Sequence, residues 1–182
     1  MKKENIYNIP NLITLSRVFL TIFIVYGIIS KIEIIIIAVA FVIGMLTDFF
    51  DGQIARGWKL VTEFGRKFDM IADRILMIGT ALAFIVSYNG IMTANHWIQI
   101  FLIMSREILT APFFLYSHFR KSVKIPRAKF IGKLTTFMQG VAFPLVIMGI
   151  FYEKFEFSIY LAIATGIIGI LSGLRHMKDL SE

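Results

Sequence analysis

Six apolar stretches, each close to the length of a helix that crosses a lipid bilayer, follow one another along this 182-residue chain. A bilayer-spanning helix needs about 20 mostly apolar residues, and 57% of the residues here are hydrophobic. The pattern predicts an all-α integral membrane bundle of six transmembrane helices. Because these spans leave no room for a separate soluble domain, we expect residues 1–182 to form one membrane domain. The expected spans are residues 12–30, 34–55, 68–88, 95–117, 133–151 and 157–175.

The basic residues concentrate in segments that a six-span arrangement places on one side of the membrane. Four lie between residues 56 and 67 and six between residues 120 and 133, whereas the opposite side carries only Lys31 and Lys154. Such an excess of lysine and arginine marks the cytoplasmic loops of a membrane protein. We therefore expect both termini and the polar face to point into the cytoplasm. Membrane topology explains the net charge of +7, so a nucleic-acid partner is not predicted.

The first residues, Met1 to Pro10, are polar and basic with a few apolar side chains interleaved. This pattern predicts a short interfacial helix before the first span. The chain has no cysteine, which excludes disulfides and thiolate metal sites.

The most informative motif is a set of aspartates around the second and third spans, with the spacing D-x2-D-G-x2-A-R-x8-G-x3-D-x3-D. Asp48 and Asp51 are three residues apart and Asp69 and Asp73 four apart, so each pair shares one face of a helix. A carboxylate at membrane depth costs about 2.5–3.5 kcal/mol at a helix centre. A divalent cation such as magnesium is the partner that offsets this cost for several carboxylates. The alternative is a solvated loop of ordinary ion pairs, which would predict no fixed spacing and no small residues in register.

This spacing resembles the signature of the CDP-alcohol phosphotransferase family at each of its fixed positions. Three further segments, Asn8–Arg17, Ser105–Ala111 and Gly132–Gln139, look like the bacterial phosphatidylglycerophosphate synthases of that family. The resemblance implies phosphatidyl transfer from CDP-diacylglycerol to glycerol 3-phosphate, with release of CMP, and it also implies a homodimer. One position departs from the pattern, because Thr135 stands where the subfamily usually has a second lysine.

The resemblance also assigns roles to the motif residues. It implies that two Mg²⁺ or Mn²⁺ ions bind the four aspartates, and that Asp73 additionally accepts the proton of the acceptor hydroxyl. The CDP moiety would be bound by Gly52, Ala55, Arg56 and Gly65. Arg17 and Arg74 are interpreted as structural partners of the acidic cluster.

A dianionic acceptor needs cations, since its phosphate is held by charge-assisted hydrogen bonds. For Arg106, the alternative to acceptor binding is a structural ion-pair network with Glu107. For the cations of the predicted loops, the alternative is a role in membrane topology and lipid binding. Thr135 keeps other acceptors open, namely phosphatidylglycerol, inositol phosphate or serine. A divalent-cation transporter is a remote alternative, because the aspartates lie towards one face and no inverted repeat is visible. The candidate acceptor-binding residues are Arg106, Arg127, Lys129, Lys133 and Arg175.

Overall fold

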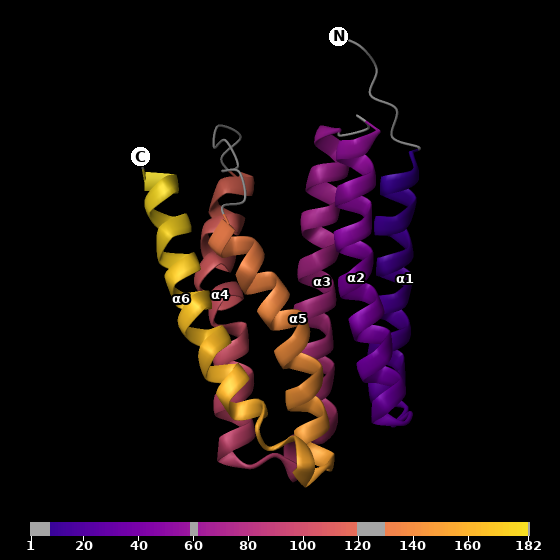
Figure 1. Ribbon diagram of the computed structural model, residues 1–182, viewed down its shortest axis with the longest axis vertical. Helices are drawn as coiled ribbons and strands as arrows, with labels where there is room; N and C mark the ends of the chain where they lie inside the picture. The colour runs from indigo at the N-terminus through magenta and orange to yellow at the C-terminus, as the bar shows by residue number, and fades with distance from the viewer. Residues whose placement is uncertain (1–7, 59–61, 120–129, 182) are drawn as a thin grey trace. The chain divides into compact units, whose positions relative to one another are not determined.

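The structure is a computed structural model that describes residues 8–58, 62–119 and 130–181 (Figure 1). Within these ranges the regular elements are helical, which confirms the all-α class for the described part of the chain. The elements are α1 (Ile9–Ile29), α2 (Ile34–Gly57), α3 (Glu63–Tyr88), η1 (Asn89–Ile91), α4 (Ala94–Phe119), α5 (Phe130–Phe151), η2 (Glu153–Phe155) and α6 (Ser158–Ser181).

Four helical segments of the described residues are long and apolar enough to cross a membrane: Ile9–Ile29, Glu63–Ile91, Ile131–Phe151 and Glu153–Arg175. A shorter apolar stretch, Ile34–Thr47, begins α2. Many large apolar side chains are exposed on these helices, among them Phe19 and Val86, as expected for surfaces that face lipid. The chain is thus a helical membrane protein, and the count of six spans stays a prediction. The predicted interfacial helix falls mainly on residues 1–7, outside the described residues.

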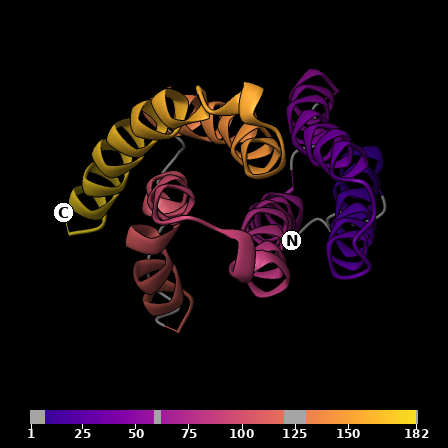
Figure 2. The same cartoon turned by 90° about the horizontal axis from the view of Figure 1, so that it is seen from below.

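The chain divides into two compact units, Met1–Asn89 and Gly90–Glu182. In the first unit, α1 packs along both α2 and α3, whereas α2 and α3 make few contacts with each other. In the second unit, α6 packs along both α4 and α5. Figure 2 shows the helices of both units from below, where α6 is seen obliquely along much of its length. The single domain predicted from the sequence is not tested by this division and stays a prediction.

Polar side chains set where α1 and α3 begin. The side chain of Asn8 caps α1 by accepting a hydrogen bond of 3.0 Å from the Asn11 N–H, and Pro10 follows in the first turn, where its missing N–H does no harm. Thr62 caps α3 in the same way, accepting a hydrogen bond of 2.9 Å from the Gly65 N–H. Both helices therefore begin earlier than the apolar pattern predicts, α1 at residue 9 rather than 12 and α3 at 63 rather than 68.

In the second unit, glycines on α6 let α4 approach closely. A Cβ atom at Gly166 would lie 2.9 Å from the Leu102 side chain, and one at Gly169 would lie 2.9 Å from Ser105 Oγ. Small residues at such spacing are a common basis of tight helix packing in membranes. This contact fixes α4 against α6 at the level of Ser105 and the neighbouring Arg106.

Candidate active site

The aspartate motif is divided between the last turns of α2 and the first turns of α3. Residues 48–56 lie in α2, and Gly65, Asp69 and Asp73 lie in α3. This confirms that each aspartate pair is carried by one helix. Since only residues 58–62 connect the two helices, both halves of the motif belong to the same end of the first unit. The side chains of Asp48, Asp51, Gly52, Ala55 and Arg56 lie outside the described residues.

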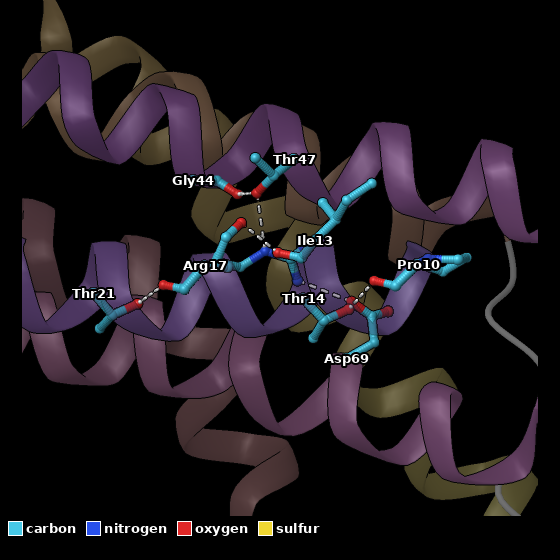
Figure 3. A network of polar contacts seen from close by, with 9 residues as sticks. Pro10, Ile13, Thr14, Arg17, Thr21, Gly44, Thr47 and Asp69 are labelled. Atoms are coloured by element: carbon cyan, nitrogen blue, oxygen red, sulfur yellow. Dashed lines mark hydrogen bonds and ion pairs between the residues drawn. The ribbon is translucent and has the colours of Figure 1, made fainter. Parts of the chain in front are cut away.

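Asp69 is held by an arginine from α1 (Figure 3). Arg17 Nη1 donates a hydrogen bond of 2.8 Å to Asp69 Oδ1, and the two groups form an ion pair. The Arg17 side chain is 0% exposed, whereas that of Asp69 is 37% exposed. The expected partnership of Arg17 with the acidic cluster is confirmed. The guanidinium lies inside the unit, while the carboxylate is partly open to its surroundings.

The same guanidinium also reaches α2. Arg17 Nε donates to Thr47 Oγ1 at 3.3 Å, and Thr47 immediately precedes Asp48. The Thr47 hydroxyl in turn donates to the Gly44 carbonyl at 2.7 Å. One buried side chain on α1 therefore contacts both helices that carry the motif. Figure 3 shows Arg17 between Thr47 on one side and Asp69 on the other.

Arg17 belongs to a polar stripe along the buried face of α1. Asn11, Thr14, Arg17 and Thr21 are all buried and recur at intervals of three or four residues, the spacing of one helix face. The hydroxyl groups of Thr14 and Thr21 donate to the carbonyls of Pro10 and Arg17 in their own helix. The stripe is visible in the sequence as four polar residues on one face of an apolar helix, and of these only Arg17 was predicted to contact the acidic cluster.

Gly65 lies where α3 begins against α1. A Cβ atom at this position would be 2.5 Å from Asn11 Oδ1 and 2.9 Å from the capping Thr62 Oγ1. Any side chain would therefore displace Thr62, which caps α3, or the Asn11 side chain of α1. The missing side chain at Gly65 therefore lets α1 and α3 approach closely. Its predicted contact with the CDP moiety stays a prediction.

Asp73 follows Asp69 by one turn of α3, and its side chain is half-buried. Among the side chains that the structure describes, no three His, Cys, Asp or Glu groups are gathered in a metal-binding cluster. Two of the four predicted ligands, Asp48 and Asp51, lie outside that part. The donor set itself fits magnesium or manganese, which prefer hard carboxylate oxygens.

In the second unit, α4 carries two neighbouring charged residues, Arg106 and Glu107, and each is hydrogen-bonded to a neutral side chain of α5. Arg106 Nη1 donates to Thr136 Oγ1 at 2.7 Å. Glu107 accepts a hydrogen bond from the amide of Gln139, and that amide also donates to the Ile103 carbonyl at 2.8 Å. Thr136 and Gln139 were not among the residues predicted for the site, because neutral polar side chains in an apolar helix give little signal.

The other acceptor candidates are placed as follows. Gly132, beside Lys133, has Arg106 Nη2 and Ser172 Oγ 3.8 Å from the position of its absent Cβ, so α4, α5 and α6 meet at this level. Lys133 and Arg175 are exposed and lie next to this meeting point in sequence. The structure thus brings Arg106 into the same region as the α5 turn that carries Lys133. Arg127 and Lys129 lie outside the described residues.

Thr135 occupies the position of the expected second lysine. Its side chain is completely buried, and its hydroxyl donates to the Ile131 carbonyl at 2.8 Å. The position therefore faces the interior of the second unit. A cation is absent here, and a hydroxyl bonded to its own helix takes its place.

The chain matches the CDP-alcohol phosphatidyltransferase family over residues 7–171, and it belongs to this family. The match covers the whole aspartate motif and most of both units, which confirms the family resemblance seen in the sequence. The chain is 34% identical to the CDP-diacylglycerol–glycerol-3-phosphate 3-phosphatidyltransferase of Rickettsia typhi over 88% of this chain and 86% of the relative. The protein of the same name from Rickettsia bellii is 31% identical over 94% of each chain. A probable phosphatidylglycerophosphate synthase of Mycobacterium tuberculosis is 30% identical over 98% of this chain and 86% of the relative.

Proposed function

We propose that this protein transfers a phosphatidyl group from CDP-diacylglycerol to glycerol 3-phosphate, forming phosphatidylglycerophosphate and CMP. The observation that carries the proposal is the complete aspartate motif of the family, divided between the ends of two helices. The names of the relatives, which state this reaction for those proteins, support the choice of donor and acceptor.

The reaction forms one phosphorus–oxygen bond and breaks another. The acceptor hydroxyl attacks the phosphorus that carries diacylglycerol, the pyrophosphate link breaks, and CMP leaves with the bridging oxygen. Asp73 would accept the proton of the attacking hydroxyl, as a positioned general base. Asp48, Asp51, Asp69 and Asp73 would hold two Mg²⁺ or Mn²⁺ ions. When bound, these ions supply charge neutralisation at the pyrophosphate and at the developing oxyanion of the leaving group.

The remaining motif residues would bind the nucleotide. Gly52 and Ala55 leave space for the CMP moiety on the last turns of α2, and Arg56 would pair with a phosphate. Gly65 would serve both the α1–α3 contact and the approach of the nucleotide. The acyl chains would remain in the bilayer beside the exposed apolar helix faces.

The acceptor phosphate would be bound by cations of the second unit. Arg106 is a strong candidate, because its described partner is the neutral hydroxyl of Thr136, which leaves its charge available for an anion. Lys133 and Arg175 are proposed to join it, together with Arg127 and Lys129. Guanidinium and ammonium groups bind phosphate through charge-assisted hydrogen bonds.

We further propose that the protein is a homodimer in the cytoplasmic membrane, with the site and both termini facing the cytoplasm. The excess of basic residues in the predicted cytoplasmic segments supports this orientation. Because the chain has no cysteine, Asn89→Cys gives a single thiol in the loop expected outside. An impermeant thiol reagent applied to intact cells should label it, and protection of that thiol would invert the orientation.

The test of the proposed reaction is CMP release from CDP-diacylglycerol by the purified protein with a panel of acceptors. Glycerol 3-phosphate should support turnover, whereas phosphatidylglycerol, inositol phosphate and serine should not. The observation that favours a different acceptor is Thr135, which stands where the subfamily usually has a second lysine. Turnover with another acceptor and none with glycerol 3-phosphate would therefore overturn the assignment but keep the class of enzyme.

A further inference from the structure

The two halves of the aspartate motif lie on helices that scarcely contact each other. α2 and α3 make few mutual contacts, while each packs along α1. The separation and rotation of the two halves must therefore be set largely through α1. Among the described contacts, the side chain of Arg17 on α1 is hydrogen-bonded to both helices. It binds Asp69 of α3 directly, and it binds Thr47 of α2, the residue before Asp48.

The geometry of the guanidinium makes this link directional. Nε and Nη1 belong to one rigid plane, so the directions of the hydrogen bonds to Thr47 and Asp69 are tied to each other. Thr47 is prepared as an acceptor, because its only hydroxyl hydrogen is donated to the Gly44 carbonyl. A lysine could supply the charge at this position but not two donors in a fixed plane.

The two side chains of this ion pair also differ in their exposure. Arg17 is 0% exposed and Asp69 is 37% exposed, so the guanidinium contacts the carboxylate from inside the unit. A cation would approach the same carboxylate from its open side. This is the arrangement in which a hydrogen-bonding partner behind a metal ligand fixes the orientation of that ligand.

We propose that Arg17 is the positioning residue of the aspartate motif, which fixes Asp69 and links it to the end of α2 through Thr47, and thereby strengthens binding of the divalent cation. This inference rests on the proposed function, because it takes Asp69 as a metal ligand. It goes beyond that function because it assigns an effect on cation affinity to Arg17, which lies on α1, a helix that carries none of the motif aspartates.

The test is Mn²⁺ binding to the detergent-purified protein, measured from the electron paramagnetic resonance signal of free Mn²⁺ without substrate. Arg17→Lys and Arg17→Gln should weaken Mn²⁺ binding about 10–100-fold, the usual effect of losing a group that orients a metal ligand. Thr47→Val removes the link from Arg17 to α2, together with the hydroxyl's bond to the Gly44 carbonyl, and should weaken binding about 2–10-fold, the equivalent of one hydrogen bond. Thr47→Val also keeps the test decisive if the Arg17 variants fail to fold.

Two controls separate positioning from general stability. Thr21→Val removes a buried hydroxyl on the same face of α1 that donates only within its own helix. Arg66→Gln removes a guanidinium paired at 3.4 Å with Glu63 on the exposed side of α3. Both should bind Mn²⁺ as the wild type does, whatever their melting temperature.

The outcomes distinguish this inference from the proposed function. If the wild type binds Mn²⁺ and the folded Arg17 and Thr47 variants bind it with equal or greater affinity, Arg17 is only a structural partner and the inference fails alone. If the wild type binds no Mn²⁺, the metal site of the proposed function fails, and the inference with it.

Discussion

In the first unit a buried arginine is paired with a carboxylate, whereas in the second unit the arginine and glutamate of α4 each bind a neutral side chain of α5. Arg17 and Asp69 neutralise each other at 2.8 Å. Arg106 contacts Thr136, and Glu107 contacts Gln139. The first arrangement holds a carboxylate in place, while the second positions a cation without cancelling its charge.

The difference fits the two halves of the proposed reaction. A site for divalent cations needs several carboxylates in fixed orientation, and a buried guanidinium that binds one of them supplies that order. A site for an anionic acceptor needs cations whose charge is still available. Substitutions in each unit therefore test whether the first unit carries the chemistry and the second unit binds the acceptor.

The largest effect is expected at Asp73. Asp73→Asn should lower kcat about 10²–10⁴-fold, because an amide cannot accept the proton of the acceptor hydroxyl. CDP-diacylglycerol binding should change little, since the loss falls on the rate. CMP release measures this, with Glu63→Gln, an exposed acid at the start of the same helix, as the control. Near-normal turnover of Asp73→Asn would show that Asp73 is not the general base.

The second comparison is between the carboxylates of the two units. Asp69→Asn removes the carboxylate that pairs with the buried Arg17 at 2.8 Å, and breaking a buried pair costs about 3–5 kcal/mol. We expect a cost towards the lower end, because Asp69 is partly exposed. Glu107→Gln keeps an oxygen that can accept the hydrogen bond from the Gln139 amide, and should cost less. Melting temperatures in metal-free buffer measure both, and equal losses would contradict the distinction between the units.

The third prediction concerns the acceptor. Lys133→Ala should raise the KM for glycerol 3-phosphate about 10–100-fold, since a hydrogen bond to a charged group contributes about 1.5–3 kcal/mol. The KM for CDP-diacylglycerol should stay unchanged. Lys154→Ala, an exposed lysine of η2, is the matched control. An equal rise for both substrates would place Lys133 outside a dedicated acceptor site.

The smallest effect is expected from a methyl group at the α1–α3 contact. Gly65→Ala should destabilise the protein by about 1–3 kcal/mol through overpacking, because its Cβ would lie 2.5 Å from Asn11 Oδ1. Gly57→Ala has no atom within 4 Å and is the control. Adding Asn11→Ala to Gly65→Ala should recover part of the stability if helix contact is the reason for the glycine, since the contact with Thr62 Oγ1 remains. A raised KM for CDP-diacylglycerol that persists in the double variant would show that the nucleotide also needs this space.

Much of the architecture follows from the sequence, because long apolar stretches in a membrane protein permit little except helices. Each expected span coincides with a helix, and the differences at the starts of α1 and α3 have a local cause. The caps Asn8 and Thr62 extend these helices beyond their apolar residues. The aspartate motif could also be recognised from the sequence, because its residues have a fixed spacing.

The contacts between helices were harder to predict. Arg17 was expected near the acids, because a charge in an apolar helix needs a partner. Thr47, Thr136 and Gln139 carry no charge, so their roles depend on which helices are neighbours, and a single sequence does not give that. Thr135 was read as a lost cation, and the structure adds that its position is buried.

The most direct test of the account is the metal dependence of phosphatidyl transfer by the wild-type protein. Purified protein is stripped with EDTA, and CMP release from CDP-diacylglycerol and glycerol 3-phosphate is then followed before and after Mg²⁺ or Mn²⁺ is added. Several carboxylates facing an anionic substrate would repel it unless bound cations reverse the local charge. We predict no release in EDTA and full recovery on adding either ion. Release at the same rate in metal-free buffer would contradict a cation site built from the aspartate motif.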